Sequence, residues 1–157
     1  MIDPDVRLAV ADDAAELRGL ERLARRGVAV TRGGGRWLDE HAEIADGWGE
    51  AIATRIVLVG EIRGAGVPPV AVGYLVADLE PGERTIVRVD QVFVHPDARQ
   101  LGFGDALLAE AIRVGRGRGA SMVEAETLPG DRDLKNLYER AGVTARLIVV
   151  SKALSDP

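Results

Sequence analysis

Apolar residues in the first third of the chain recur every three or four positions, a period that indicates amphipathic helices. Asp12 or Asp13 is placed to cap a first helix that continues to about residue 26. A second helix is expected over residues 37–53. Between them lies the glycine segment 31–36, TRGGGR, which suits either a mobile lid or a simple flexible connection.

The middle of the chain changes to the alternation typical of strands. Residues 55–62, 70–79 and 85–94 are rich in valine and isoleucine, and short glycine- or proline-containing turns separate them. Such short connections predict antiparallel neighbours. Residues 6–10 form a further short apolar segment, which we expect to be the first strand.

The last third predicts a helix over residues 104–118, followed by a strand over 121–127. A strand, helix and strand in this order imply a parallel pair with residues 85–94. A short helix ending at Gly142 and a final strand over 146–150 complete the pattern. We therefore expect one α+β domain over residues 1–157, with a mixed, mostly antiparallel sheet flanked by helices.

The amino-acid composition excludes several classes of chemistry and of binding partner. The chain has no cysteine, so disulfides and thiolate chemistry are excluded, and His41 and His95 lie too far apart for a recognisable metal motif. The net charge of -5 favours partners other than nucleic acid. No apolar run approaches a membrane span and no signal peptide is recognisable, so we expect a cytoplasmic protein without metal or membrane contact.

The strongest chemical signal is a glycine turn that joins the strand ending at Val94 to the following helix. Arg99, Gly102 and Gly104 give the pattern Arg-x-x-Gly-x-Gly. Glycines at a helix N-terminus let free N–H groups approach an anion such as a phosphate. A Walker loop is excluded because no Gly-Lys-Ser/Thr occurs in the sequence. A dinucleotide-binding fingerprint is excluded because the position of its third glycine is occupied by Leu107. The plain alternative is a polar turn whose glycines serve only packing.

Together with its flanks, this turn resembles the acetyl-CoA-binding signature of the GNAT superfamily of N-acetyltransferases. The matching positions are Val94, Pro96, Arg99, Gly102 and Gly104, whereas Gln100 stands where the family usually has glycine. The resemblance implies a GNAT-type fold and acetyl-CoA as cosubstrate. Backbone groups of two segments would bind it: Val92, Phe93 and Val94 along the pantetheine, and Arg99, Gln100, Leu101, Gly102, Phe103, Gly104, Asp105 and Ala106 around the pyrophosphate.

The segment 131–143 resembles the last helix of the same family through Leu137, Tyr138, Glu139 and Gly142. Tyr138 would then stand beside the coenzyme sulfur and give a proton or hydrogen bond to the leaving thiolate. Its place on an apolar stripe is equally that of a core aromatic.

An amine acceptor must lose a proton before it attacks, so a carboxylate near the acceptor is expected. Asp90 lies four residues before Val94, where many relatives carry an acid, and aspartate is disfavoured in strands. We take it as the candidate base. The alternatives are an ion pair with Arg88 or with an arginine of a neighbouring strand, or exposure to solvent. Glu124 and Glu126 are weaker candidates.

The function predicted from the resemblance is transfer of an acetyl group to a primary amine of a small molecule or peptide, by direct attack. The rival is a non-catalytic acyl-CoA-binding sensor module of the same fold. Relatives usually end in two further strands, whereas this sequence has room for one over residues 146–154. The shortened C-terminal strand region leaves the acceptor side open, or a second subunit covers it in a homodimer.

Overall fold

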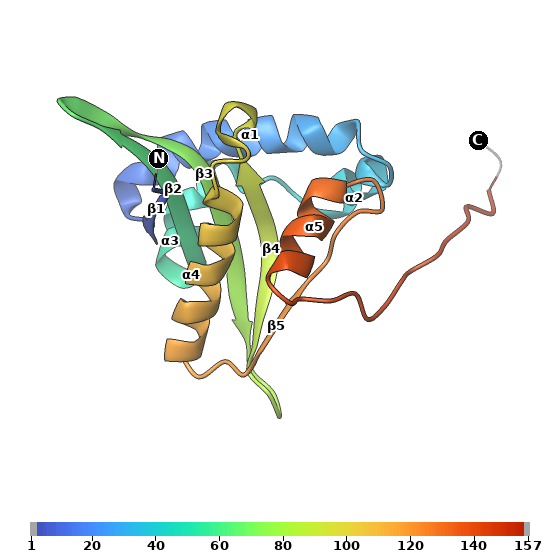
Figure 1. The fold of residues 1–157 in the computed structure, drawn as a ribbon. Helices are drawn as coiled ribbons and strands as arrows, with labels where there is room; N and C mark the ends of the chain where they lie inside the picture. Colours follow the sequence, from blue (N-terminus) through green and yellow to red (C-terminus); the bar gives the residue numbers. More distant parts are fainter. Residues whose placement is uncertain (1–2, 156–157) are drawn as a thin grey trace.

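A five-stranded sheet forms the centre of the computed structural model, which describes residues 3–155 (Figure 1). The strand order follows the sequence, and the pairing is antiparallel except between the last two strands, which are parallel. The predicted α+β fold with a mixed, mostly antiparallel sheet is confirmed. The strands are β1 (Asp5–Leu8), β2 (Ile56–Gly64), β3 (Val67–Glu80), β4 (Ile86–Val94) and β5 (Met122–Ala125).

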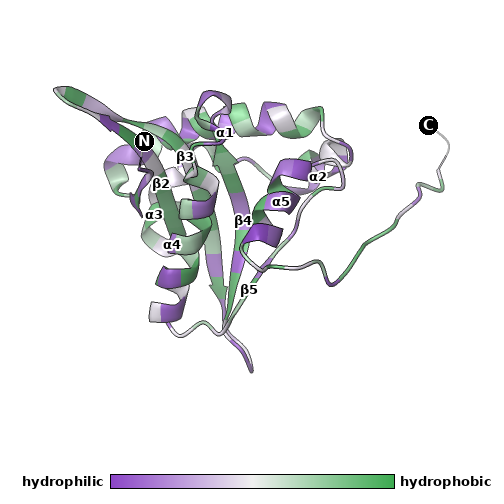
Figure 2. Cartoon of the chain, viewed as in Figure 1, coloured by the Kyte–Doolittle hydropathy of each residue, from purple (hydrophilic) through white to green (hydrophobic). Residues whose placement is uncertain are grey.

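Helices cover both faces of the sheet. On one face, α4 and α5 enclose a core with β2, β3 and β4; on the other, α1 and α3 enclose a second core with β2 and β3. Hydropathy shows the same layering, with apolar residues on the strands and on the inner sides of the helices (Figure 2). The helices are α1 (Ala14–Ala29), α2 (Gly34–Glu40), α3 (Trp48–Thr54), α4 (Phe103–Gly117) and α5 (Arg132–Arg140), with 3₁₀ turns at η1 (Ala11–Asp13), η2 (Ala45–Gly47) and η3 (Pro96–Ala98). No helix of the described chain is long and apolar enough to cross a membrane.

The single helix predicted over residues 37–53 is wrong, because the chain forms α2 and α3 with a break between them. The buried carboxylate of Glu21, on α1, accepts the backbone N–H groups of Ile44 at 2.8 Å and Ala45 at 3.1 Å, and the Trp48 indole N–H at 3.0 Å. Ala45 has a left-handed φ of 50°, which a continuous helix does not permit. A contact between distant residues therefore overrides the local helical period.

The glycine segment predicted as a hinge or lid is a closely packed turn. Gly33 has a φ of +86°, and a Cβ on the buried Gly34 would lie 1.8 Å from the carbonyl oxygen of Val28. The β5–α5 connection lies against the same turn, since a Cβ on Gly130 would come within 2.8 Å of the Arg32 nitrogen. Glycine is required for its left-handed backbone at residue 33 and for space at residues 34 and 130.

The final strand predicted over residues 146–150 does not form. Residues 143–155 contain no helix or strand, and the segment leads away from the domain (Figure 1). A strand needs a partner for its backbone groups, and within the described residues this segment has none. The C-terminal strand region is therefore shorter than the sequence predicts.

Candidate functional site

The two parallel strands β4 and β5 separate half-way along β4. Their pairing runs from Ile86 opposite Met122 to Val89 opposite Ala125 and then stops. At this point β4 carries a bulge: Val89 pairs with β3 and so does Gln91, which leaves Asp90 as the extra residue. Beyond the bulge, β4 keeps β3 on one side, while β5 diverges from its other side (Figure 1).

Backbone groups of β4 face this opening. The His95 N–H donates to the Val72 carbonyl at 2.7 Å, so by strand alternation Phe93 also bonds toward β3. The N–H and C=O groups of Val92 and Val94 therefore point away from β3, into the opening. The Phe93 side chain packs in the opposite core, with its ring centroid 6.0 Å from that of Tyr74. Of the three residues expected along a pantetheine, Val92 and Val94 turn their backbone groups toward the opening, and Phe93 turns its backbone groups toward β3.

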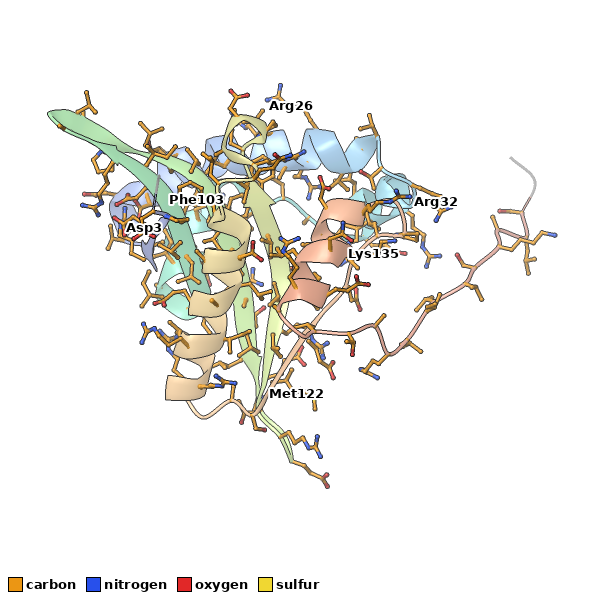
Figure 3. All side chains as sticks on the ribbon, viewed as in Figure 1. Asp3, Arg26, Arg32, Phe103, Met122 and Lys135 are labelled. Carbon is orange, nitrogen blue, oxygen red and sulfur yellow. The ribbon has the colours of Figure 1, made fainter. Side chains whose placement is uncertain are left out.

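The glycine turn continues directly from this open edge. Gln100 and Gly102 both have left-handed backbones, with φ of 67° and 87°. The buried side chains of Ala98 and Phe103, packed with Val72, hold the turn at both ends. Phe103 lies at the start of α4 (Figure 3). The turn is therefore anchored by its apolar residues while its polar backbone stays outside.

Several N–H groups of the turn are free to bind a ligand. Leu101 N–H donates to Ala98 at 3.4 Å and Ala106 N–H donates to Gly102 at 3.0 Å. Within residues 3–155 no hydrogen bond uses the remaining amides, which are those of Gln100, Gly102, Phe103, Gly104 and Asp105. Consecutive free N–H groups at a helix N-terminus form a concave anion site, to which the helix dipole adds positive potential.

One acidic and two basic side chains lie around this site. The exposed Asp105 lies in the first turn of α4, where its carboxylate would oppose a bound anion. Arg140, on α5, pairs with it through Nε–Oδ1 and Nη2–Oδ2 contacts of 3.0 and 3.2 Å. Arg99 is also exposed and donates to the Val94 carbonyl at 3.4 Å. The N-terminal end of α4 thus keeps a positive character.

Tyr138 combines a buried ring with a free hydroxyl. Its residue is only 6% exposed and belongs to the core between α4, α5 and the sheet. The Tyr138 hydroxyl makes no hydrogen bond within residues 3–155. The only buried side-chain nitrogen or oxygen there without a partner is Arg18 Nε, so the Tyr138 hydroxyl is not buried and reaches the surface. Burial, with a smaller contribution from the Asp131 carboxylate, raises the pKa of Tyr138 above its usual range. The phenol therefore keeps its proton at neutral pH.

Asp90 points to the face of the sheet that carries α1 and α3, because Val87 and Val89, on alternate positions of β4, pack in the core on the opposite face. There its carboxylate accepts a hydrogen bond from Arg55 Nη2 at 2.9 Å. The same guanidinium holds Asp78 through two bonds of 2.7 and 2.6 Å. An ion pair was the alternative to catalysis for Asp90, and the partner is Arg55 rather than Arg88. Catalysis by Asp90 stays a prediction.

Glu124 is also committed to ion pairs. It lies 2.7 Å from Arg88 and 3.4 Å from Arg146, and the hydrogen bond from Arg88 lowers the pKa of its carboxyl group. Glu126 is exposed just beyond the end of β5.

A family model described as the Acetyltransferase (GNAT) family matches residues 29–143, which is most of the sequence. The chain belongs to the GNAT acetyltransferase family. The predicted resemblance is thereby confirmed, and the fold extends it over the rest of the domain. Among curated proteins, none matches the chain in sequence.

The fold of this GNAT chain is similar to those of several acetyltransferases of known structure. It is similar to AAC(6')-Iy in complex with a CoA-S-monomethyl-acetylneamine bisubstrate analogue, with 20% identity, a TM-score of 0.68 and coverage of 96% of this chain and 99% of that one. It is similar to the aminoglycoside acetyltransferase meta-AAC0020, from an uncultured soil metagenomic sample, in complex with sisomicin, with 13% identity, a TM-score of 0.70 and coverage of 98% and 97%. A ribosomal-protein-alanine N-acetyltransferase from Brucella melitensis biovar Abortus 2308 has 19% identity, a TM-score of 0.66 and coverage of 98% and 100%.

Two arginines in contact with candidate site residues, Arg55 and Arg140, were missed by sequence reasoning. Arg55 reaches Asp90 from the loop before β2, and Arg140 reaches Asp105 from α5. No local pattern marks either arginine, because each partner lies 35 residues away. Across residues 3–155, no cluster of three or more histidine or acidic side chains is suited to a metal ion.

Proposed function

We propose that this chain transfers an acetyl group from acetyl-CoA to the primary amine of an acceptor. One observation carries the proposal: the unpaired edge of β4 runs directly into the free amides at the N-terminus of α4. Coenzyme A needs both features in this order, because its pantetheine arm carries amides and its pyrophosphate carries negative charge. Three of the similar structures, all of AAC(6')-Iy, contain coenzyme A or an analogue of it, which supports the assignment.

The residues divide the binding between them. The amides of Gln100, Gly102 and residues 103–105 would hold the pyrophosphate, with Arg99 as an adjacent cation. The outward backbone groups of Val92 and Val94 would bond the pantetheine amides and polarise the thioester carbonyl.

The chemistry we propose is direct attack. The neutral amine nitrogen bonds to the thioester carbon, the C–S bond breaks, and the sulfur leaves as a thiolate. Tyr138, protonated because burial raises its pKa, gives that thiolate a proton or hydrogen bond. The amine proton passes to Asp90, directly or through water. No covalent enzyme intermediate is formed.

For the acceptor we propose a small-molecule amine. Among the similar structures, one contains sisomicin and another a bisubstrate analogue built on acetylneamine, which supports this class. A cytoplasmic location remains our expectation.

Thiol release from acetyl-CoA, measured with a panel of aminoglycosides, polyamines, amino acids and peptides, tests the proposal. We expect release that depends on the acceptor, and mass spectrometry should find one added acetyl group on it. Binding of coenzyme A without release by any amine would favour the sensor module. No rise in melting temperature with coenzyme A would reject both.

Gly102→Ala is expected to weaken acetyl-CoA binding about tenfold. The left-handed backbone at residue 102 costs an L-residue about 1–2 kcal/mol, and relief of that strain turns the free amides away from the pyrophosphate. Isothermal titration with coenzyme A measures the effect. Gly117→Ala is the matched control, since Gly117 is exposed near the end of α4 and an added methyl group meets nothing within 4 Å. Equal affinity in both variants would contradict the role of the turn.

Asp90→Asn is expected to lower kcat/KM about a hundredfold or more, most strongly on the acid side of the pH profile, where acceptor deprotonation is hardest. Asp78→Asn is its control, because it removes the other carboxylate from the same Arg55 guanidinium and leaves Asp90 intact. Steady-state kinetics across the pH range distinguishes the two variants. Equal losses would mean that Asp90 acts only through its ion pair.

A further inference from the structure

The Asp105 carboxylate lies where it can compete with the coenzyme for the free amides of the glycine turn. Gly102 is the N-cap of α4, and Asp105 follows it by three residues. An acidic side chain at this spacing can fold back and accept the N–H of the N-cap residue, which closes a capping box. The Gly102 N–H is one of the groups that the proposed function assigns to the pyrophosphate, so this inference rests on that function.

The chain closes such a contact elsewhere. Asp13 lies three residues after Val10, the N-cap of η1, and accepts the Val10 N–H at 2.7 Å. Asp13 also pairs with Arg7 of β1 at 2.8 Å, so an ion pair by itself does not prevent a carboxylate from capping. The outcome therefore depends on where the arginine lies.

At Asp105 the arginine lies beside the helix. Both carboxylate oxygens accept from Arg140, Oδ1 from Nε at 3.0 Å and Oδ2 from Nη2 at 3.2 Å, and among residues 3–155 neither accepts the Gly102 N–H. Arg140 comes from α5, which packs along the first turn of α4. A Cβ on Gly104 would lie 3.4 Å from the side chain of Leu137, one turn before Arg140. The pair therefore draws the carboxylate toward α5 and away from the end of α4.

The exposure of this pair indicates what it contributes. The Arg140 and Asp105 side chains are 57% and 51% exposed, and an ion pair this open to solvent adds little to stability because water and salt screen it. Its consequence for the position of the carboxylate is larger, since both oxygens are held by one guanidinium. We propose that Arg140 is a positioning residue for coenzyme A: by holding Asp105 it keeps the Gly102 amide free for the pyrophosphate.

Isothermal titration with coenzyme A tests this role. Arg140→Met removes the guanidinium but keeps an unbranched stem, and it should raise the Kd about tenfold, the scale of an N-cap hydrogen bond. Asp105→Ala removes the competing carboxylate, so the double variant Asp105→Ala/Arg140→Met should bind as tightly as Asp105→Ala alone.

Arg113→Met is the matched control for the loss of charge. Arg113 is also an exposed arginine that pairs with an acid, Glu110, but both lie farther along α4 from the glycine turn, so the Kd should not change. An unchanged Kd in Arg140→Met would overturn the proposal. A direct contact between Arg140 and the phosphates would weaken the double variant as much as the single one, and that result would overturn it as well.

Amide hydrogen exchange, followed by NMR, tests the same role without a ligand. The Gly102 amide should exchange rapidly in the parent, slowly in Arg140→Met because Asp105 caps it, and rapidly again in the double variant. A merely structural role of Arg140 would not slow this exchange, so an unchanged rate at Gly102 in Arg140→Met would overturn the proposal. A parent that does not bind coenzyme A would instead overturn the proposed function, and the exchange rates would still decide whether Arg140 restrains Asp105.

Discussion

Tyr138→Phe is expected to lower kcat by a hundredfold or more while the KM for acetyl-CoA stays near that of the parent. General acid catalysis contributes about 10²–10⁴ in rate, and the substitution removes the only proton that the side chain can give. The ring remains in its core between α4 and α5, so the fold is retained. Steady-state kinetics with a saturating acceptor measures the loss.

The pH profile of the parent should show no alkaline decline from this phenol. Because burial raises the pKa of Tyr138 above its usual range, the acidic form persists as the pH rises through neutrality and beyond. The activity that depends on Tyr138 is therefore present at neutral pH and is lost only when strongly alkaline conditions remove the proton.

The other tyrosine provides a matched control. Tyr74 is fully buried on β3, and its hydroxyl donates to Oε1 of Gln91 at 2.8 Å. Tyr74→Phe loses one hydrogen bond, which costs about 1 kcal/mol of stability, and should leave kcat within a few-fold of the parent. If both variants lose turnover equally, or if Tyr138→Phe loses none, Tyr138 serves only as a core aromatic.

Local patterns were sufficient to predict the strands, most helices and the glycine turn. Each of these depends on neighbouring residues: alternation along β2, β3 and β4, a helical stripe along α4, and glycines where the chain passes into that helix. The family resemblance then pointed to acetyl-CoA as the expected ligand. The bulge at Asp90 has no such local signature, although it divides the paired half of β4 from the open half.

Contacts between distant residues explain what the sequence did not predict. The break between α2 and α3 depends on Glu21, which lies 23 residues before Ile44. The Arg55–Asp90 pair joins the loop before β2 to the strand next but one in the sheet. Residues 146–150 have a clear strand pattern, but no strand of the described residues pairs with them. For Glu21 and for Asp90, the residue that makes the contact lies too far along the sequence to be predicted from neighbouring residues.

Glu21→Ala is expected to lower the free energy of unfolding by roughly 3–5 kcal/mol, the largest stability effect among these variants. The carboxylate is fully buried and accepts three N–H groups, those of Ile44, Ala45 and the Trp48 indole. Each donor left buried without an acceptor costs about 1–3 kcal/mol. At about 2–4 °C per kcal/mol for a chain of this size, the melting temperature should fall by roughly 10 °C. Scanning calorimetry measures it.

Glu16→Ala isolates this effect from the loss of a negative charge on α1. Glu16 lies on the same helix but is exposed, so its removal should change stability by less than about 0.5 kcal/mol. The strained Ala45 backbone also depends on Glu21, because without the carboxylate nothing compensates the left-handed conformation between α2 and α3. Hydrogen exchange in Glu21→Ala should therefore accelerate first at residues 41–48. A uniform acceleration across the sheet would instead place Glu21 in the global core rather than in this connection.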